Sequence, residues 1–591
     1  MDNFFGNVEF NYKFNNWLSA TYRLGATVSS SSGKSTAGAY AFSLFAKASG
    51  KNNASSDFVA QVSDASNMSS RINSELFVTA KKEYGRFKGD VLLGQSFRET
   101  NSKGINVSSN NLGIPNVFNV SVRKGEPGAF ESSSKTRLER YFGKFSLGYN
   151  NWLFGEFTGS YDIDSRLANP YNFNKKDISF FYPGGNVSVV LTDAIKGLKG
   201  STLSYFKLRG AISKTGNVNL NAYSLENTYS SGVDFPFGNL IGFTSNNTLR
   251  QSNYKPEFVL NKEVGAEFGF FNNRVNIEAS AYTQDNTNQL ITVAYSAATG
   301  FPSALLNAAS FTNKGLEFDL KLTPIFKIGD FNMDLKFNYA YQENKVNSLV
   351  NGVDELGVGN GNFIIKGSPA YTFKLTDYKR DPSGRVIVDN ITGYPSIDPI
   401  VKKFGQTIPK HIFGINFAAN YKNLSLTAVA DFRSGNQIFA GLGADIDFSG
   451  LSYRSGLNDR RPFIFPNSSI DDGTGKFVPN TNTYTQDGGY NFWSQGATNT
   501  NINSNYLVSG AFWKLREVAL TYTFPKSLFI GRGLKGAAFS ITGRNLLTWL
   551  PITNEWTDPE FSNTTGNAQG VSSRDNNPAS RIFGANITLQ F

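Results

Sequence analysis

The chain holds 591 residues, no cysteine and a single histidine, His411, which excludes zinc sites built on cysteine and histidine, thiolate catalysis and a histidine-based triad. Its net charge of +11 comes from scattered basic residues, so the sequence predicts no nucleic-acid-binding surface. Aromatic residues make up 14% of the chain and charged residues only 17%, a balance typical of a transmembrane β-barrel, where each strand shows lipid half of its residues.

Apolar and polar residues alternate along many segments, which predicts strands with one apolar and one polar face. In 331–341 every odd position is apolar, from Phe331 to Tyr341, and the even positions are polar apart from Ala340. No amphipathic helix and no apolar run of the ~20 residues needed for a membrane helix accompanies them. The predicted strands are 8–14, 17–28, 74–82, 87–97, 137–149, 152–162, 185–191, 203–213, 262–271, 275–283, 314–323, 331–341, 411–421, 424–432, 512–524, 537–546 and 580–591.

The connections between these strands alternate between short and long. Short links lie at 272–274, 324–330, 422–423 and 525–536. Long loops are expected at about 30–73, 98–136, 214–260, 284–313, 342–410, 433–511 and 547–580. Short periplasmic turns and long extracellular loops are typical of outer-membrane barrels, whereas a soluble sandwich or propeller has no reason for this asymmetry. The sequence therefore predicts an all-β protein, a transmembrane antiparallel β-barrel integral to the outer membrane.

The strand pattern also predicts that the barrel domain, 1–591, is incomplete at its amino-terminal side. About 16 to 17 strands are expected from the sequence, whereas single-chain bacterial barrels have even numbers. The first segment lacks a partner across an outer loop, and a strand pattern begins without a preceding secretory signal. The last predicted strand ends on Phe591, an aromatic terminal residue that is common in outer-membrane barrels and serves here as the expected assembly terminus.

Charged side chains on the polar face of the strands are candidates for lining the lumen. They are Arg209, Glu317, Asp319, Asp334, Lys336, Arg516 and Arg544. Ordinary polar side chains of a wet or plugged lumen would give the same pattern as a substrate path or contacts to a plug. The sequence does not rank these residues.

Aromatic residues in the long loops are candidates for contacts with sugars or peptides at the mouth of the barrel. They are Phe465, Tyr490, Trp493 and Trp556. Loop packing and the interfacial aromatic girdle explain the same residues, and this second interpretation is favoured.

No metal site, cofactor or enzyme activity is expected. The acidic pairs Asp445/Asp447 and Asp471/Asp472 could supply oxygen ligands for calcium, but neither has the spacing of a known calcium loop, and solvated acidic loops are commoner. The carboxylates and the single histidine form no recognisable acid–base pair.

Several short motifs appear in a fixed order from about Tyr205 to the terminus. They are YFKLRG at 205–210 followed by KTGN at 214–217, YKPE at 254–257, NKGLE at 313–317, FWKLREV at 512–518, GRNL at 543–546, WTDPE at 556–560 and the terminal Phe591. Each is weak alone, but together and in this order they resemble SusC/RagA-type TonB-dependent outer-membrane transporters.

The resemblance implies an energised importer of oligosaccharides, peptides or similar nutrients. It implies a barrel of roughly 22 strands with a plugged lumen, a SusD-like surface lipoprotein as a lid, and a TonB complex that pulls on an amino-terminal box. The sequence shows no signal peptide, TonB box or plug, so this chain is expected to be about the carboxy-terminal three quarters of the barrel. Two alternatives stay open: a stand-alone passive porin, and an accessory or structural barrel subunit of an outer-membrane complex.

Overall fold

The structure is a computed structural model that describes residues 1–48, 56–169, 174–226, 228–231, 240–250, 254–294, 297–350, 352–494, 499–531, 533–562, 569–572 and 579–591. Several of the predicted loops contain residues outside this described part. The chain divides into two compact units, Met1–Val187 with Ser213–Glu257, and Ser188–Ile212 with Phe258–Phe591. Among the described residues one antiparallel sheet holds 18 strands, which confirms the predicted all-β class.

The first unit consists mainly of long antiparallel strands joined to their neighbours in sequence. They are β1 (Asp2–Lys13), β2 (Leu18–Ala37), β3 (Gln61–Tyr84), β4 (Phe87–Ser109), β5 (Gly128–Tyr149) and β6 (Leu153–Asp164). β7 (Ser179–Val190) and β8 (Leu203–Asn217) cross the boundary between the units. Smaller elements are α1 (Leu44–Ala48), η1 (Val120–Val122), η2 (Ser165–Leu167), β9 (Tyr229–Ser231), β10 (Phe243–Ser245) and β11 (Thr248–Arg250).

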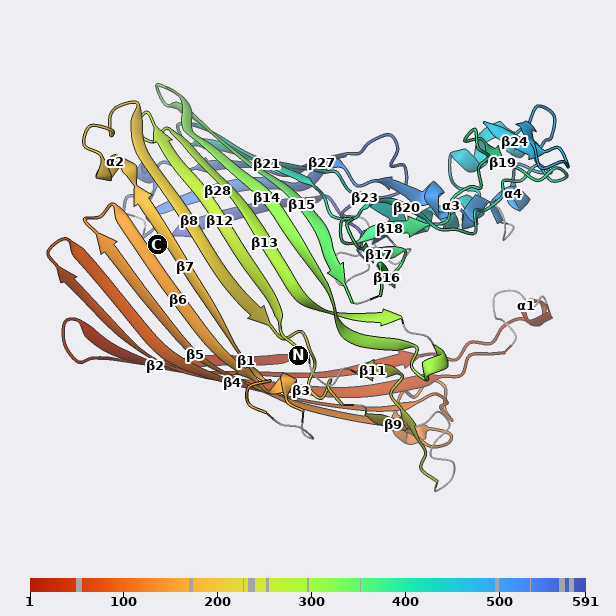
Figure 1. The fold of residues 1–591 in the computed structure, drawn as a ribbon, viewed down its shortest axis with the longest axis horizontal. Helices are drawn as coiled ribbons and strands as arrows, with labels where there is room; N and C mark the ends of the chain where they lie inside the picture. Colours follow the sequence, from red (N-terminus) through yellow and green to blue (C-terminus); the bar gives the residue numbers. More distant parts are fainter. Residues whose placement is uncertain are drawn as a thin grey trace. The chain divides into compact units, whose positions relative to one another are not determined.

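The second unit also consists mainly of long antiparallel strands, and Figure 1 shows β13, β14 and β15 side by side. Its strands are β12 (Glu257–Phe270), β13 (Val275–Ala294), β14 (Ser303–Ile328), β15 (Phe331–Leu349), β21 (His411–Tyr421), β22 (Leu424–Ser434), β27 (Phe512–Thr523), β28 (Gly536–Trp549) and β30 (Ile582–Gln590). α2 (Leu191–Ala194), η3 (Ala297–Thr299) and η7 (Lys526–Phe529) lie in its connections. No helix in the described part of the chain is long and apolar enough to cross a membrane.

The links between β5 and β6 and between β12 and β13 are tight turns whose residues accept left-handed backbone. Asn150 and Asn151, between β5 and β6, have φ of 49° and 61°. Asn272 and Asn273, between β12 and β13, have φ of 57° and 62°. Asparagine tolerates positive φ better than most residues, and two such residues in succession suit a hairpin whose twist matches the strands.

The strands of the first unit extend well into the stretches predicted as loops 30–73 and 98–136. The β2–β3 ladder continues to the pair Ala37 and Gln61, and the β4–β5 ladder to Ser108 and Gly128. These outer portions are rich in serine and asparagine on both faces, so they lack the apolar alternation by which the membrane-spanning parts were recognised. Backbone ladders maintain the strands there, together with cross-strand contacts such as Lys34 with Asp64 at 3.1 Å and Lys103 with Glu131 at 3.0 Å.

Each of the two strands at the ends of the chain has a long open side. β1 pairs with β2 from Asp2 to Lys13, and all of its residues are exposed. β30 pairs with β28, and all of its residues are exposed as well, including Phe583 and Ile587. In the described part of the chain each strand therefore presents unpaired backbone groups along one edge.

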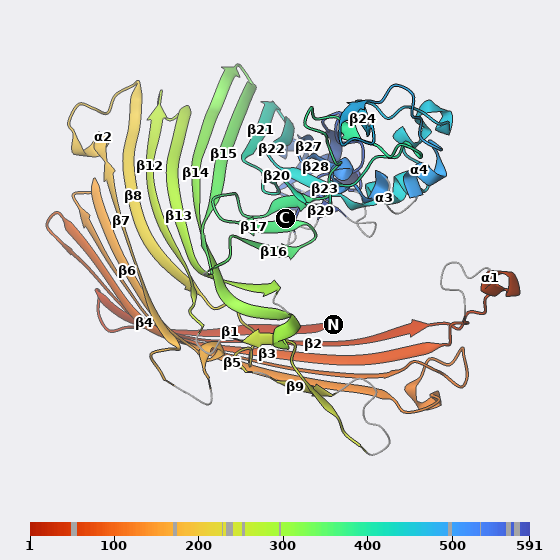
Figure 2. The ribbon, with the colours of Figure 1, turned by 45° about the vertical axis from the view of Figure 1, so that its right-hand side comes forward.

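The three longest loops of the second unit fold together into a compact body, which we call the loop head (Figure 2). It comprises the described residues of 350–410, 435–511 and 550–572. Its elements are β16 (Glu355–Gly359), β17 (Asn362–Ile365), β18 (Thr372–Leu375), β19 (Val386–Ile387), β20 (Lys402–Gln406), β23 (Gln437–Ala440), α3 (Gly441–Phe448), η4 (Arg454–Arg460), β24 (Ser468–Asp471), β25 (Phe477–Pro479), α4 (Tyr490–Ser494), η5 (Asn499–Asn501), η6 (Asn503–Tyr506), β26 (Leu507–Ser509) and β29 (Val571–Ser572). Phe373, Leu375 and Val571 form its buried core, with Phe439 packed against them.

Candidate functional site

Two aromatic rows on the second unit mark the borders of the membrane. One row consists of direct cross-strand partners Tyr339, Phe413, Phe432, Trp513 and Trp549. The other consists of the aromatic residues Phe331, Tyr421, Tyr522 and Phe539, with Leu424 between Tyr421 and Tyr522, next to the short turns. The rows lie eight residues apart on β15, which is about 20 Å for a strand rising ~3.3 Å per residue at a tilt of ~40°. This agrees with the apolar band of about 25 Å between aromatic girdles in outer-membrane barrels.

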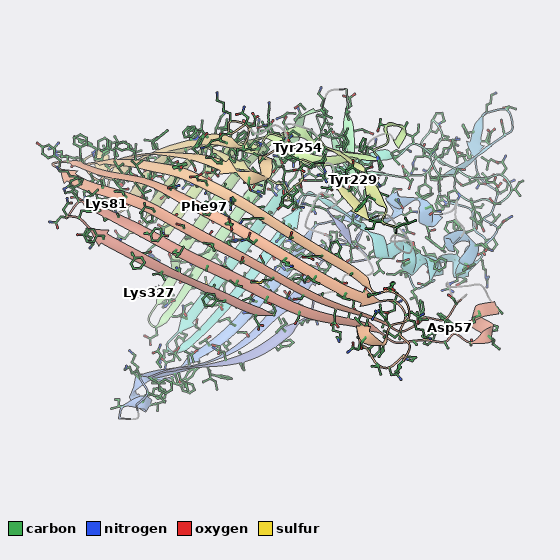
Figure 3. The ribbon with its side chains drawn as sticks, turned by 90° about the horizontal axis from the view of Figure 1, so that it is seen from below. Asp57, Lys81, Phe97, Tyr229, Tyr254 and Lys327 are labelled. Carbon is green, nitrogen blue, oxygen red and sulfur yellow. The ribbon has the colours of Figure 1, made fainter. Side chains whose placement is uncertain are left out.

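The first unit carries a matching border near its short turns, where the Phe87 and Tyr149 rings lie 4.9 Å apart and the Tyr149 and Trp152 rings 5.6 Å apart. Large apolar side chains above it stay exposed, among them Leu93 at 64%. In Figure 3, Lys81 and Asp57 lie toward opposite ends of the strands of the first unit, and Phe97 lies between them. The outward face is therefore built for lipid, and the opposite face carries the charged residues.

On the inner face of the first unit, five charged residues and one serine form a row across six strands. The row runs Glu9, Arg23, Glu75, Ser96, Arg140 and Asp162, each the direct partner of the next. Arg23 Nε lies 2.6 Å from Glu9, and two nitrogens of Arg140 each lie 2.7 Å from an oxygen of Asp162. The carboxylate of Asp162 is almost completely buried, so this bidentate pair is the firmest contact of the row.

On the second unit, Arg209 of β8 is surrounded by three glutamates. Its guanidinium lies 2.5 Å from Glu278, 3.1 Å from Glu267 and 3.1 Å from Glu263. Glu267, Glu278 and Asp319 are direct partners across β12, β13 and β14. Without a counter-ion, these neighbouring carboxylates would repel one another. Arg209 therefore stabilises the wall here by compensating carboxylates.

Glu317, Asp319, Asp334 and Lys336 share the inner face of β14 and β15, as their alternation predicted. The structure assigns them no ion pair or side-chain hydrogen bond among the described residues. They are available to water or solute rather than fixed in a constellation, and their role as lumen lining stays a prediction.

Arg516 and Lys514 of β27 fasten the loop 547–580 to the wall. Arg516 donates to Asp431 of β22 and, over 2.6 Å, to Glu560 of the loop. Lys514, with only 4% of its side chain exposed, lies 2.7 Å from Asp558 and 2.6 Å from Glu560. A shift in the register between Val429 and Ala430 inserts Arg516 as an extra residue, so that it reaches the same cluster as Lys514.

This cluster is electrically balanced, with Arg433, Lys514 and Arg516 facing Asp431, Asp558 and Glu560. Burial opposes ionisation of Glu560, but hydrogen bonds from Arg516 and Lys514 outweigh it and lower its pKa to about 2. The cluster therefore has no spare charge for a solute. Arg544, another residue predicted to line the lumen, lies outside this cluster and pairs with Glu517 at 2.7 Å in a contact that is largely exposed.

The candidate loop aromatics take part mainly in packing of the loop head. Trp493 is 7% exposed. The Phe465 ring lies 5.5 Å from that of Tyr378, and Trp556 lies 6.1 Å from Tyr506. Tyr490 differs, because 67% of it is exposed although its ring packs against Phe448. Contact with a solute stays a prediction, and Tyr490 is the best placed of the four.

The centre of the loop head is an ion pair that the sequence did not reveal. Arg454 binds Asp447 through two nitrogens, at 3.0 and 2.5 Å, and Asp447 is completely buried. The guanidinium lies over three rings, Trp493 at 5.3 Å, Tyr506 at 5.0 Å and Trp556 at 4.6 Å. Burial, together with Asp447, raises the pKa of Tyr506, which donates a hydrogen bond of 2.8 Å to that carboxylate.

Three of the four aspartates that could have held calcium, Asp447, Asp471 and Asp472, bind protein groups. Asp447 serves Arg454 and Tyr506. Asp471 accepts the N–H groups of Gly473 and Gly475, and Asp472 those of Thr474 and Lys476. Among the described residues no group of acidic or histidine side chains is arranged to hold a metal ion.

Sequence reasoning missed Arg140, Asp162, Arg454 and the fastening role of Glu560. Arg140 and Asp162 stood at polar positions of predicted strands, so a register prediction could have paired them. Arg454 and Asp447 are seven residues apart in an irregular loop, and no local pattern signals a contact that depends on how this loop folds with the loop that carries Trp556.

A family model described as TonB dependent receptor-like, beta-barrel, matches residues 1–528. The TonB-dependent receptor P26 of Formosa agariphila is 25% identical over 562 residues, which cover 88% of this chain and 53% of the relative. The TonB-dependent receptor SusC of Bacteroides thetaiotaomicron is 28% identical over 249 residues, 40% of this chain and 23% of the relative. This chain therefore spans about half the length of the P26 receptor.

The solved structure of the RagAB peptide transporter shares the fold with a TM-score of 0.77 at 18% identity, covering 100% of this chain and 62% of that one. The RagAB peptide importer in its open-open state gives a TM-score of 0.73. The matched family consists of receptors and transporters. The predicted resemblance to SusC/RagA-type transporters is thereby confirmed, and the chain belongs to the TonB-dependent receptor-like β-barrel family of the outer membrane.

Proposed function

We propose that this chain supplies barrel wall and outer loops of a TonB-linked importer for nutrients such as oligosaccharides or peptides. The observation that carries the proposal is the combination of a lipid-facing band with a charged inner face and a packed loop head fastened to the wall by Glu560. A passive pore needs only the lipid-facing band and the charged inner face. A loop body anchored by a buried, balanced ion cluster supports a mouth that binds its solute before passage.

The family resemblance extends the proposal to two partners, a SusD-like lipoprotein over the mouth and a TonB complex in the periplasm. RagAB is described as a peptide importer, which supports peptides as one substrate class for this protein. Contact of Tyr490 with the solute or the lid is part of the proposal, because its ring is exposed on the loop head.

Uptake in cells tests the import function. Cells lacking the gene should lose growth on a peptide mixture or on oligosaccharides as sole nutrient, and dissipating the proton-motive force should abolish uptake by the intact strain. Uptake that continues after dissipation would replace the proposal with a passive pore. Normal growth of the deletion strain on both nutrient classes would favour an accessory barrel subunit.

A further inference from the structure

Two arginines on the inner face of the first unit lack the partners that every neighbouring arginine has. Arg98 of β4 is the cross-strand partner of Asn73, and Arg71 of β3 lies two residues from Asn73 on the same face. They are therefore diagonal neighbours, a spacing of about 7–8 Å between backbones that long side chains bridge easily. Arg140 stands one diagonal step beyond Arg98, since its partner is Ser96.

The nearest carboxylates are saturated by other arginines. Asp162 is held by two nitrogens of Arg140. Asp164, in the same cross-strand row as Arg98, is held by Arg166 at 2.9 and 2.6 Å. Both carboxylates are about 2% exposed, so neither has room or free lone pairs for a further guanidinium.

The remaining acidic neighbour is Glu75, and its carboxylate is directed to Arg23 at 3.4 Å. The structure gives Arg71 and Arg98 neither an ion pair nor a hydrogen bond among the described residues. Both are exposed on the face that carries charge rather than on the lipid face, and Arg98 lines a hollow of about 620 Å³ with Asn73 and Ser96.

Adjacent free guanidiniums repel one another, and an anion between them removes that repulsion. A guanidinium fork matches the geometry of carboxylate, sulfate or phosphate through paired N–H donors. We propose that Arg71 and Arg98 form a binding site for an anionic group of a solute on the inner face of the wall, a carboxylate, sulfate or phosphate.

This inference rests on the proposed function in one respect only, namely that the inner face of the wall is the face that meets the solute. It predicts that a solute carrying negative charge is held here, whereas the balanced cluster around Glu560 holds none. Because binding is measured without transport, loss of import and loss of binding are separate results.

Equilibrium dialysis of the detergent-purified protein against radiolabelled sulfate at low ionic strength tests the site. Wild type should bind sulfate at one saturable site, displaced by phosphate and acetate but not by glucose. The double variant R71Q/R98Q should lose at least tenfold in affinity. Heat-modifiable mobility on gels checks that each variant is folded.

The matched control is K103Q/K135Q, which also removes two positive charges, one from β4 and one from β5. Lys103 and Lys135 pair with Glu131 and Glu99 instead of standing free. This control should bind sulfate like wild type. Unchanged binding by R71Q/R98Q, equal loss in the control, or no saturable binding by wild type would each overturn the site. The last result would point to an acidic segment of the protein itself as the partner of the two arginines.

Discussion

The wall strands and the loop head of the second unit are stabilised in opposite ways. On β27, β28 and β30 large apolar side chains stay exposed, such as Leu520 at 42% and Ile541 at 53%. In the loop head Phe373 and Tyr506 are completely buried. The wall relies on backbone ladders and on lipid as its apolar partner, whereas the head contains a core like that of a small soluble domain. The same chain thus places apolar side chains against lipid in the wall and against other protein side chains in the loop head. Substitutions in the two regions should therefore have different effects.

The largest effect is expected from Arg454→Met in the loop head. The change leaves the buried carboxylate of Asp447 without its cation, and breaking a buried ion pair in this way costs about 3–5 kcal/mol. Limited trypsin digestion of membranes should cut the head at least tenfold faster, while heat-modifiable mobility of the barrel is retained. Glu355→Gln removes the partner of Lys374 in the same head, and because 44% of the Glu355 side chain is exposed to water the change should have a smaller effect. Equal protease sensitivity of the two variants would refute a buried centre.

A charge on the lipid face of the wall should be the next most damaging. Phe417 lies halfway between the aromatic rows, as the partner of Leu335, and a lysine near the middle of the bilayer costs about 2–4 kcal/mol. Phe417→Lys should lower the urea midpoint of folding into liposomes. Ala418→Lys is the matched change on the inner face, opposite Asp334, and should be tolerated. If Ala418→Lys were the more harmful, the assignment of faces would be reversed.

Acid should release the loop 547–580 from the wall before it unfolds the barrel. The pKa of Glu560 is lowered from 4.5 to about 2, so its stabilisation is complete above about pH 4.5 and is lost as the pH falls through 2. The shift corresponds to at most about 3 kcal/mol, and screening by water reduces it to about 2 kcal/mol. Because the chain has no cysteine, a spin label on Thr553→Cys can report loop mobility, which should rise between pH 4.5 and 2. Glu560→Gln should give a mobile label already at pH 7, and no difference between the two proteins would contradict the fastening role.

The smallest effect is expected for an exposed pair on the wall. Arg544→Gln removes the contact with Glu517, in which 62% of the arginine side chain is exposed, and should cost less than about 1 kcal/mol. Arg516→Gln, one strand away, leaves Glu560 and Asp431 to share only the longer contacts with Arg433, at 3.5 and 3.8 Å, and should cost clearly more. Urea titration of both variants side by side measures the difference, and similar midpoints would mean that the balanced cluster contributes no more than a surface pair.

The membrane-spanning parts of the strands could be predicted because a bilayer imposes a period of two. Every odd residue from Phe331 to Tyr339 faces lipid, and Asp334 and Lys336 lie on the opposite face as expected. The outer portions could not be predicted in this way. Between Ser29 and Ser35, for example, both faces meet water, so no alternation distinguishes a strand from a loop.

The all-β class, the outer-membrane location, the tight turns and the shared strand face of residues such as Asp334 and Lys336 could be predicted from local patterns, because lipid and backbone geometry act on residues that are neighbours in sequence. Which charges neutralise one another could be seen only once the chain was folded. Arg140 meets Asp162 across a ladder, and Arg454 meets three aromatic rings from separate loop segments, whereas Arg71 and Arg98 meet no carboxylate. Such pairing depends on strand register and loop packing, and neither is encoded in a local pattern.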